Sequence, residues 1–175
     1  MPVDLSDKLF PGMAYPNKYQ EGEIDGVVFK TLLTHLSEDG EFKELLRADD
    51  NIYGNQFKEF AQANYSVTFP GMIKGIHLHQ NQDDCWFVAS GQAKVMLVDL
   101  RIKSQTFGNR KTIILGEAVP RLLVIPRGVG HGFKVLGNKN LVMVYFVSAF
   151  YGDQDEGHIR WNDPRLGFKW ETNFD

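Results

Sequence analysis

Short apolar runs separated by turn residues dominate the central part of the chain. Gly, Asn, Asp and Pro gather between these runs, as at residues 126–130 and at Gly137 and Asn138. Short strands with turn signals at close, regular intervals are typical of an antiparallel sandwich or barrel. The pattern therefore predicts an all-β fold. We expect its central strands at residues 72–78, 85–89, 93–100, 111–115, 121–125, 132–136 and 141–147.

The N-terminal part of the chain is less regular. A β-rich run at residues 27–33 predicts one more strand, and residues 42–47 have the composition of a brief helix. Residues 1–25 are rich in Pro, Gly and charge, and we expect them to form an arm that wraps a partner subunit. Residues 162–175 form an aromatic, turn-rich tail. Because no internal repeat or low-complexity segment interrupts the chain, we expect residues 1–175 to form a single domain.

Composition and charge argue against several classes of protein. The 175 residues are 43% hydrophobic and 23% charged, which is ordinary for a globular protein. A formal net charge of -3 argues against a general binder of nucleic acid, although a local pocket can still be basic. The longest apolar run, residues 141–147, is too short to span a bilayer, and residues 1–10 lack an apolar signal core. Cys85 is the only cysteine, which fits a reducing compartment, so we expect a cytoplasmic protein that binds no membrane.

Two histidines separated by one residue form the first candidate site. In a strand, His77 and His79 point to the same face. Two imidazoles on one face, followed by the carboxylate of Asp84, can hold a divalent metal ion. The fuller pattern consists of His77-x-His79, Asp84, Gly91 and, later, Pro126-x-Gly128-x-x-His131. It resembles the two signature motifs of the cupin superfamily, with Asp84 where a glutamate is usual.

This resemblance implies a cupin jelly roll, which is a double-stranded β-helix barrel, with a few short helices. In the cupins that bind metal, the matching positions are the metal ligands. The metal set that the resemblance implies for this chain is therefore His77, His79, Asp84 and His131. The alternative is that these side chains are structural or face the solvent.

A longer series of motifs runs along most of the chain. It comprises Gln62-Ala63-Asn64-Tyr65-Ser66, Lys74-Gly75-Ile76-His77, Asp99-Leu100-Arg101, residues 104–108 and 125–133, Tyr145, Tyr151, Glu156-Gly157 and Trp161-Asn162-Asp163-Pro164. In order and spacing, the series resembles that of dTDP-4-dehydrorhamnose 3,5-epimerases and related dTDP-sugar isomerases, over roughly residues 39–170. The series as a whole is specific for the family but not for the substrate.

The family resemblance implies roles for eight residues. His77 stands at the position of the general base, and Tyr145 stands at that of the general acid, across the sugar ring. Glu44 matches a glutamate that lines the pocket, and Phe150 sits where an aromatic side chain stacks near the nucleoside. The remaining residues fall at positions that contact the substrate: Gln62, Asn64, Lys74 and His131. Family members are typically homodimers that exchange N-terminal strands, so we expect a homodimer.

The chemistry of a 4-keto sugar explains these residue types. The C4 ketone acidifies the hydrogens at C3 and C5, and histidine is a base whose pKa suits their removal. The resulting enolate oxygen needs a hydrogen-bond donor or a positive charge in a dry pocket. Inversion needs reprotonation from the opposite face, which is the role implied for Tyr145. No metal or redox cofactor is required. The predicted function is an epimerase or isomerase acting on a 4-keto-6-deoxysugar carried by a nucleoside diphosphate.

Three features depart from the family pattern. The family's histidine base is usually oriented by an Asp in a C-terminal Ser-x-Lys-Asp segment, which this sequence lacks. Asp163, Asp175 or another acid is then needed in its place. The family's pocket lysine, which helps to hold the enolate, aligns with Asp84. Finally, the residue that is usually Gln in the first histidine motif is His79.

These departures keep two other functions open. The changes at Asp84 and His79 move the site toward a metal-dependent cupin, in which a divalent cation can replace the lost lysine as the enolate stabiliser. The missing partner of the base leaves open a non-catalytic binder of sugar nucleotides. The fold alone does not choose among these functions.

Lys74 raises a separate difficulty. It lies three residues from His77, and hence on the opposite face of a regular strand. The two side chains can join the same pocket only if the strand bulges between them, which Gly75 permits.

Overall fold

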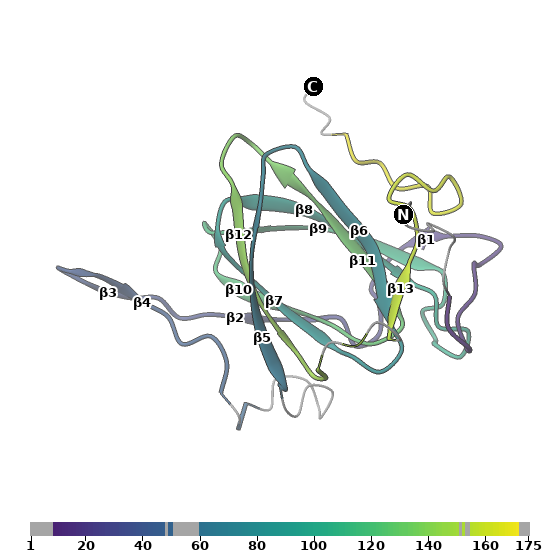
Figure 1. The fold of residues 1–175 in the computed structure, drawn as a ribbon, viewed down its shortest axis with the longest axis horizontal. Helices are drawn as coiled ribbons and strands as arrows, with labels where there is room; N and C mark the ends of the chain where they lie inside the picture. The colour runs from purple at the N-terminus through teal and green to yellow at the C-terminus, as the bar shows by residue number, and fades with distance from the viewer. Residues whose placement is uncertain (1–8, 48, 51–59, 151, 153–154, 172–175) are drawn as a thin grey trace.

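The computed structural model describes residues 9–47, 49–50, 60–150, 152 and 155–171. These residues form two sheets that face each other and a separate hairpin that projects from them (Figure 1). In spatial order, the first sheet contains β1 (Gln20–Glu21), β9 (Asn109–Gly116), β8 (Gln92–Asp99), β11 (Val129–Leu136), β6 (Ile73–His79) and β13 (Glu156–His158). The second sheet contains β2 (Val28–Thr31), β10 (Arg121–Ile125), β7 (Asp84–Ser90), β12 (Leu141–Val147) and β5 (Gln62–Thr68). The projecting hairpin consists of β3 (His35–Ser37) and β4 (Gly40–Phe42).

The period-2 alternation of the strands sets which side chains face the barrel interior. In β5, for example, Gln62, Asn64 and Ser66 are half-buried, whereas Tyr65 and Val67 are exposed. One face of the strand therefore lines the interior and the other faces water. Within the two sheets the strands pair antiparallel, except that β1 lies parallel to β9. The prediction of an all-β jelly roll is confirmed.

The main apolar core fills part of the space between the two sheets. It includes Leu97 from β8 and Ile125 from β10, both of which are almost completely buried. Trp86, Phe133 and Met143 belong both to this core and to the wall of a cavity. The apolar packing therefore ends where the cavity begins, and it supports the cavity from one side.

The prediction of a few short helices is wrong for the described residues, including the helix expected at residues 42–47. Phe42 ends β4, and residues 43–47 have no regular structure. So short a segment does not offset the cost of starting a helix. Leu45 and Leu46 instead pack against an apolar cluster on the outer face of the five-stranded sheet. The described part of the chain contains no helix that could cross a membrane.

Apolar side chains of residues 9–19 pack on the outer face of the six-stranded sheet, and β1 then pairs with its edge strand β9. Phe10 is buried in a cluster with Ile76 and Leu78 of β6, and Trp170 from the C-terminal tail completes this cluster. The described parts of the arm and of the tail therefore pack on their own barrel. That the arm also wraps a partner subunit stays a prediction.

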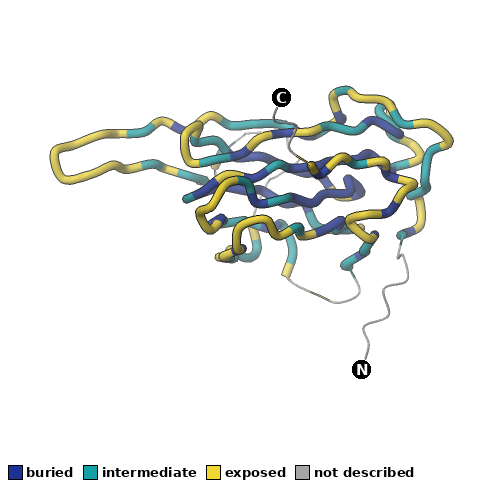
Figure 2. Tube along the Cα trace, turned by 90° about the horizontal axis from the view of Figure 1, so that it is seen from above, coloured by how far each residue is buried: buried dark blue, intermediate teal, exposed yellow. Residues whose placement is uncertain are grey.

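The hairpin formed by β3 and β4 is the most exposed part of the described chain (Figure 2). Leu36 and Phe42 leave 80% and 63% of their surface in contact with solvent, and Leu33, at its base, leaves 70%. An extension that carries three exposed apolar side chains is not stabilised by burial against this barrel.

A bulge in β6 changes which side chains of this strand face the interior. Along the pairing with β11, His77 lies opposite His131, but Lys74 lies opposite Phe133, so β6 carries one extra residue. Gly75 sits in the bulge with a φ of 119°, and a Cβ there would lie 2.6 Å from a backbone atom of β11. Only glycine fits this position. The bulge brings Lys74 to the same side of the sheet as His77, and both line one cavity. The bulge that the spacing of these two residues calls for, if they share a pocket, is therefore present.

Candidate active site

A cavity of about 360 Å³ lies between the two sheets. Strands β5, β7 and β12 form one wall, and strands β6, β11 and β13 form the other. Its volume falls within the range of pockets that hold small-molecule ligands. Most of the site residues predicted from the sequence line this cavity, namely His77, Tyr145, Gln62, Asn64, Lys74 and His131.

Two predicted residues lie elsewhere in this chain. Glu44 follows β4, is exposed, and forms an ion pair with Arg47 at 4.0 Å. Phe150 follows β12 and is 77% exposed. Neither lines the cavity of the single chain. The roles that the family resemblance implies for these two residues stay predictions.

His77 projects from β6 into the cavity and is held by a carboxylate from the neighbouring strand. Its Nδ1 atom lies 2.7 Å from Oε1 of Glu156, the first residue of β13. Because Glu156 pairs with His79 across the two strands, its side chain is a diagonal neighbour of His77. The hydrogen bond from His77 lowers the pKa of Glu156, so this carboxylate is ionised at neutral pH. An ionised acceptor at Nδ1 fixes the proton there and leaves the lone pair of Nε2 available to a substrate.

Sequence reasoning did not single out Glu156 as the carboxylate partner of His77. It named Asp163, Asp175 or another acid for that position. Asp163 instead accepts hydrogen bonds from the backbone and the guanidinium of Arg165, and Asp175 lies outside the described residues. Glu156 and His77 are 79 positions apart, and they meet only because β13 pairs with β6. No local pattern in the sequence signals that pairing.

Tyr145 approaches the cavity from the opposite wall. In β12 it lies between Asn64 of β5 and Trp86 of β7. Burial raises the pKa of Tyr145, and the negative charges of Asp84 and Glu156 raise it further. The phenol therefore stays protonated at neutral pH, and it can serve as a proton donor.

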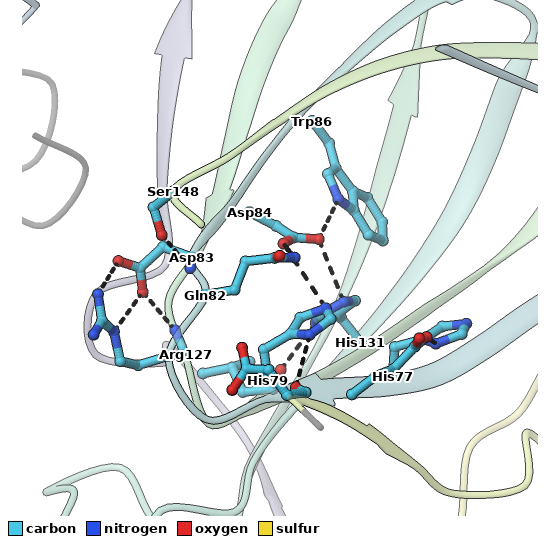
Figure 3. A network of polar contacts seen from close by, with 12 residues as sticks. His77, His79, Gln82, Asp83, Asp84, Trp86, Arg127, His131 and Ser148 are labelled. Carbon is cyan, nitrogen blue, oxygen red and sulfur yellow. Dashed lines mark hydrogen bonds and ion pairs between the residues drawn. The ribbon is translucent and has the colours of Figure 1, made fainter. Parts of the chain in front are cut away.

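His79, Asp84 and His131 form a second group in the cavity wall (Figure 3). Nε2 of His79 lies 3.9 Å from Oδ1 of Asp84, and Nε2 of His131 lies 3.6 Å from Oδ2 of Asp84. One ligand atom from each residue lies within 4.8 Å of the other two. His77, the fourth member of the metal set implied by the cupin motifs, is not in this group. Burial lowers the pKa of His131 to about 4, so its imidazole is neutral at neutral pH.

At the start of β7, two adjacent carboxylates point in different directions. Asp84 faces the cavity and accepts hydrogen bonds from Nε1 of Trp86 at 3.0 Å and from Nε2 of Gln82 at 2.8 Å. Asp83 points away from the cavity and pairs with Arg127 at 2.8 Å (Figure 3). Because Asp83 is paired with an arginine outside the cavity, Asp84 is the carboxylate of the two that a ligand in the cavity can contact.

The fold and the cavity together define a class of protein. The jelly roll is the barrel of the cupins, and inside it a histidine oriented by a carboxylate faces a protonated phenol. Inversion beside a ketone needs such groups on opposite faces of the ring, so the class is that of cupin-type carbohydrate epimerases. A family model described as dTDP-4-dehydrorhamnose 3,5-epimerase matches residues 21–175, and the chain belongs to this family.

Individual relatives agree with this assignment. The spore coat polysaccharide biosynthesis protein SpsL of Bacillus subtilis is 45% identical over 153 residues, which cover 86% of this chain and 99% of SpsL. A dTDP-4-dehydrorhamnose 3,5-epimerase of Mycobacterium tuberculosis is 30% identical over 157 residues, which cover 87% of this chain and 77% of that protein. The structure of dTDP-6-deoxy-D-glucose-3,5-epimerase from Legionella pneumophila, in complex with dTDP-4-keto-L-rhamnose, matches with a TM-score of 0.75 at 27% identity, covering 87% of this chain and 82% of that one. The family predicted from the motifs is therefore confirmed.

Proposed function

We propose that this protein epimerises a dTDP-linked 4-keto-6-deoxysugar at C3 and C5 by proton transfer, without a redox cofactor. The observation that carries the proposal is the placement of two groups in one cavity. His77, hydrogen-bonded to Glu156, lines one wall, and the protonated Tyr145 lines the other. Family membership supports the substrate class, since the Legionella relative was crystallised with dTDP-4-keto-L-rhamnose.

The reaction follows from this arrangement in two proton transfers at each carbon. Nε2 of His77 removes the proton beside the C4 ketone, and the electron pair of the broken C–H bond forms the enolate. The ionised Glu156 stabilises the imidazolium that results. Tyr145 then gives its phenolic proton to the opposite face of the same carbon, which inverts it. Solvent restores the protons of both residues between turnovers.

Other residues in the cavity suit the binding of a sugar nucleotide. Gln62 donates a hydrogen bond to Asn64 at 2.7 Å, and both face the cavity from β5, where their amides can contact sugar hydroxyl groups. Lys74 is exposed and lines the same cavity, so its ammonium can reach a diphosphate. His131 completes the contacts that the family resemblance implies.

We also propose that the protein is a cytoplasmic homodimer. The exposed apolar side chains of the hairpin, Leu36 and Phe42, support burial against a second subunit. Glu44 and Phe150 lie outside the cavity of one chain, which is consistent with a site completed at a subunit interface. Light scattering should give twice the mass of one chain, and a single-chain mass at micromolar concentration would contradict the dimer.

A deuterium wash-in experiment tests the function directly. The protein is incubated in heavy water with dTDP-4-keto-6-deoxyglucose, and exchange at each ring carbon is followed by NMR spectroscopy. We expect exchange at both C3 and C5, and none with His77→Asn. Absence of exchange in folded protein that still binds dTDP would contradict the proposal and favour a non-catalytic binder. Exchange at C3 alone would restrict the activity to a 3-epimerase or a ketoisomerase.

A further inference from the structure

We infer that His79, Asp84 and His131 form a binding site for one divalent transition-metal ion in the wall of the cavity. The three residues come from three strands, β6, β7 and β11, whose pairing in the two sheets fixes their backbones. Their ligand atoms lie within 4.8 Å of one another, and both Asp84 and His131 are buried.

The two imidazoles are oriented with their Nε2 atoms toward Asp84. Nδ1 of His131 lies 3.0 Å from the carbonyl oxygen of Val129, and Nδ1 of His79 lies 3.2 Å from the carbonyl oxygen of Asp155. A carbonyl oxygen only accepts, so each Nδ1 carries a proton, and Nε2 is the ring nitrogen that faces Asp84. Histidines that bind metals are held in the same way, with one ring nitrogen donating to a carbonyl and the other facing the ion.

The carboxylate of Asp84 is oriented in the same manner. Trp86 donates to Oδ2 and Gln82 donates to Oδ1, so each oxygen is already held by one donor. Each oxygen also faces one of the two imidazole Nε2 atoms, at 3.6 Å for His131 and 3.9 Å for His79. These distances are too long for hydrogen bonds.

Two imidazole rings and one carboxylate therefore lie together in the wall, and each is held by a hydrogen bond outside the group. A buried carboxylate is stabilised by positive charge beside it, which a bound cation supplies. Two imidazoles and one carboxylate are a common ligand set for Zn²⁺ and Fe²⁺. Ligand atoms around a tetrahedral Zn²⁺ lie about 3.3 Å apart at bond lengths of about 2.0–2.1 Å. Small side-chain movements are enough to reach that spacing.

The cation would also change the charge balance of the cavity, a point that rests on the proposed epimerase function. Among the described residues that line the cavity, Lys74 is the only lysine or arginine, whereas Asp84 and Glu156 both carry carboxylates. A negatively charged enolate next to these two groups is disfavoured. A divalent ion held by Asp84 supplies positive charge in this wall when it is bound.

Metal titration tests the site without reference to activity. Protein without an affinity tag is stripped with a chelator and titrated with Zn²⁺ by calorimetry, and with Co²⁺ by visible absorption. We expect one ion per chain, and a Co²⁺ spectrum typical of nitrogen and oxygen ligands at low coordination number. Asp84→Asn and His79→Asn should each weaken Zn²⁺ binding about 100-fold or more, since each removes a direct ligand.

Glu156→Gln is the matched control, because it neutralises the other carboxylate of the same cavity without removing a ligand, and it should weaken Zn²⁺ binding far less than Asp84→Asn. Thermal unfolding checks that each variant is folded, and the Co²⁺ spectrum of the unaltered chain decides the question if Asp84→Asn does not fold. Failure of the stripped protein to bind either ion would overturn the site, as would equal binding by folded Asp84→Asn. Exchange in heavy water without metal binding would overturn the site and leave the proposed function standing. Metal binding without exchange would support the site and contradict the proposed function.

Discussion

Glu156 accepts a hydrogen bond from Nδ1 of His77 at 2.7 Å, across the pairing of β13 with β6. The contact joins His77 to a carboxylate whose pKa is lowered by that same hydrogen bond. It therefore keeps His77 in one tautomer and one orientation, with Nε2 turned to the cavity. In the proposed reaction, this contact is the one that orients His77 for proton transfer.

Replacing Glu156 with Gln should slow the chemistry without weakening nucleotide binding. The amide can donate to Nδ1 and so stabilise the wrong tautomer, and we expect deuterium exchange to fall about 10²- to 10⁴-fold at saturating substrate. Affinity for dTDP, measured by calorimetry, should not change. Glu156→Asp keeps an acceptor on a shorter side chain, so its exchange rate should lie between those of the unaltered chain and Glu156→Gln. A parallel loss of exchange and dTDP affinity would instead indicate a structural role.

Replacing Tyr145 with Phe should separate exchange from inversion. His77 can still remove a proton and return a deuteron to the same face, so label should enter the sugar while its configuration is retained. Inversion should fall about 100-fold or more, because the proton donor on the opposite face is gone. Proton NMR of the product distinguishes the two outcomes. Undiminished inversion in Tyr145→Phe would assign the acid to another residue.

Alanine at Gly75 should destabilise the fold more than alanine at a second glycine with positive φ. Gly75 has a φ of 119° and no room for a Cβ, whereas Gly137 has a φ of 70° and nothing within 4 Å of a built Cβ. We expect Gly75→Ala to cost about 2–5 kcal/mol, from backbone strain and overpacking together. Gly137→Ala should cost only about 1–2 kcal/mol, from the backbone alone. Urea unfolding of both variants measures the difference, and equal losses would mean that the bulge relaxes.

The stability of the barrel at low pH should depend on Asp99. Burial alone would raise the pKa of Asp99, but hydrogen bonds from Arg101, Ser104 and Thr106 outweigh it and lower the pKa. As the pH falls, Asp99 is therefore protonated in the unfolded chain, at an ordinary pKa of about 3.9, before it is protonated in the folded chain. The stabilisation is therefore complete above about pH 4, and it is lost as the pH falls through the lower folded value.

Asp99→Asn tests this dependence. We expect it to lower the free energy of unfolding by about 2–4 kcal/mol at neutral pH, because three half-buried donors lose a buried, ionised acceptor. The same variant should lose less further stability than the unaltered chain between about pH 4 and pH 2. Urea unfolding across that range gives both quantities. A variant that loses stability in acid as steeply as the unaltered chain would show that other carboxyl groups dominate.

Much of the barrel could be predicted because its strands carry local signals. Alternation along β12 places Tyr145 on the face of Leu141, Met143 and Val147, and three of these four line the cavity. The spacing of Lys74 and His77 showed that a shared pocket needs a bulge, and a glycine at position 75 identified where it occurs. Turn residues and alternation act over a few positions, so a sequence displays them directly.

The features that the sequence did not reveal depend on contacts between distant segments. The residues that follow Phe42 favour a helix by composition, but pairing with His35 makes Phe42 part of a strand. His77 was grouped with the metal ligands by motif, yet its Nδ1 atom is taken by Glu156. Glu156 itself lies in a strand of three residues, too short for any periodic signal. Long-range pairing decides all three positions.

The location of Glu156 also places the proposed catalytic contact at the edge of the six-stranded sheet. β13 is a strand of three residues that has β6 as its one neighbour among the described strands, and short edge strands open at a lower free energy than interior ones. Opening of β13 would release His77 from its partner while the rest of the barrel stays folded. Mild denaturant should consequently abolish turnover before it unfolds the protein, and amides of β13 should exchange with solvent faster than those of β8 and β11.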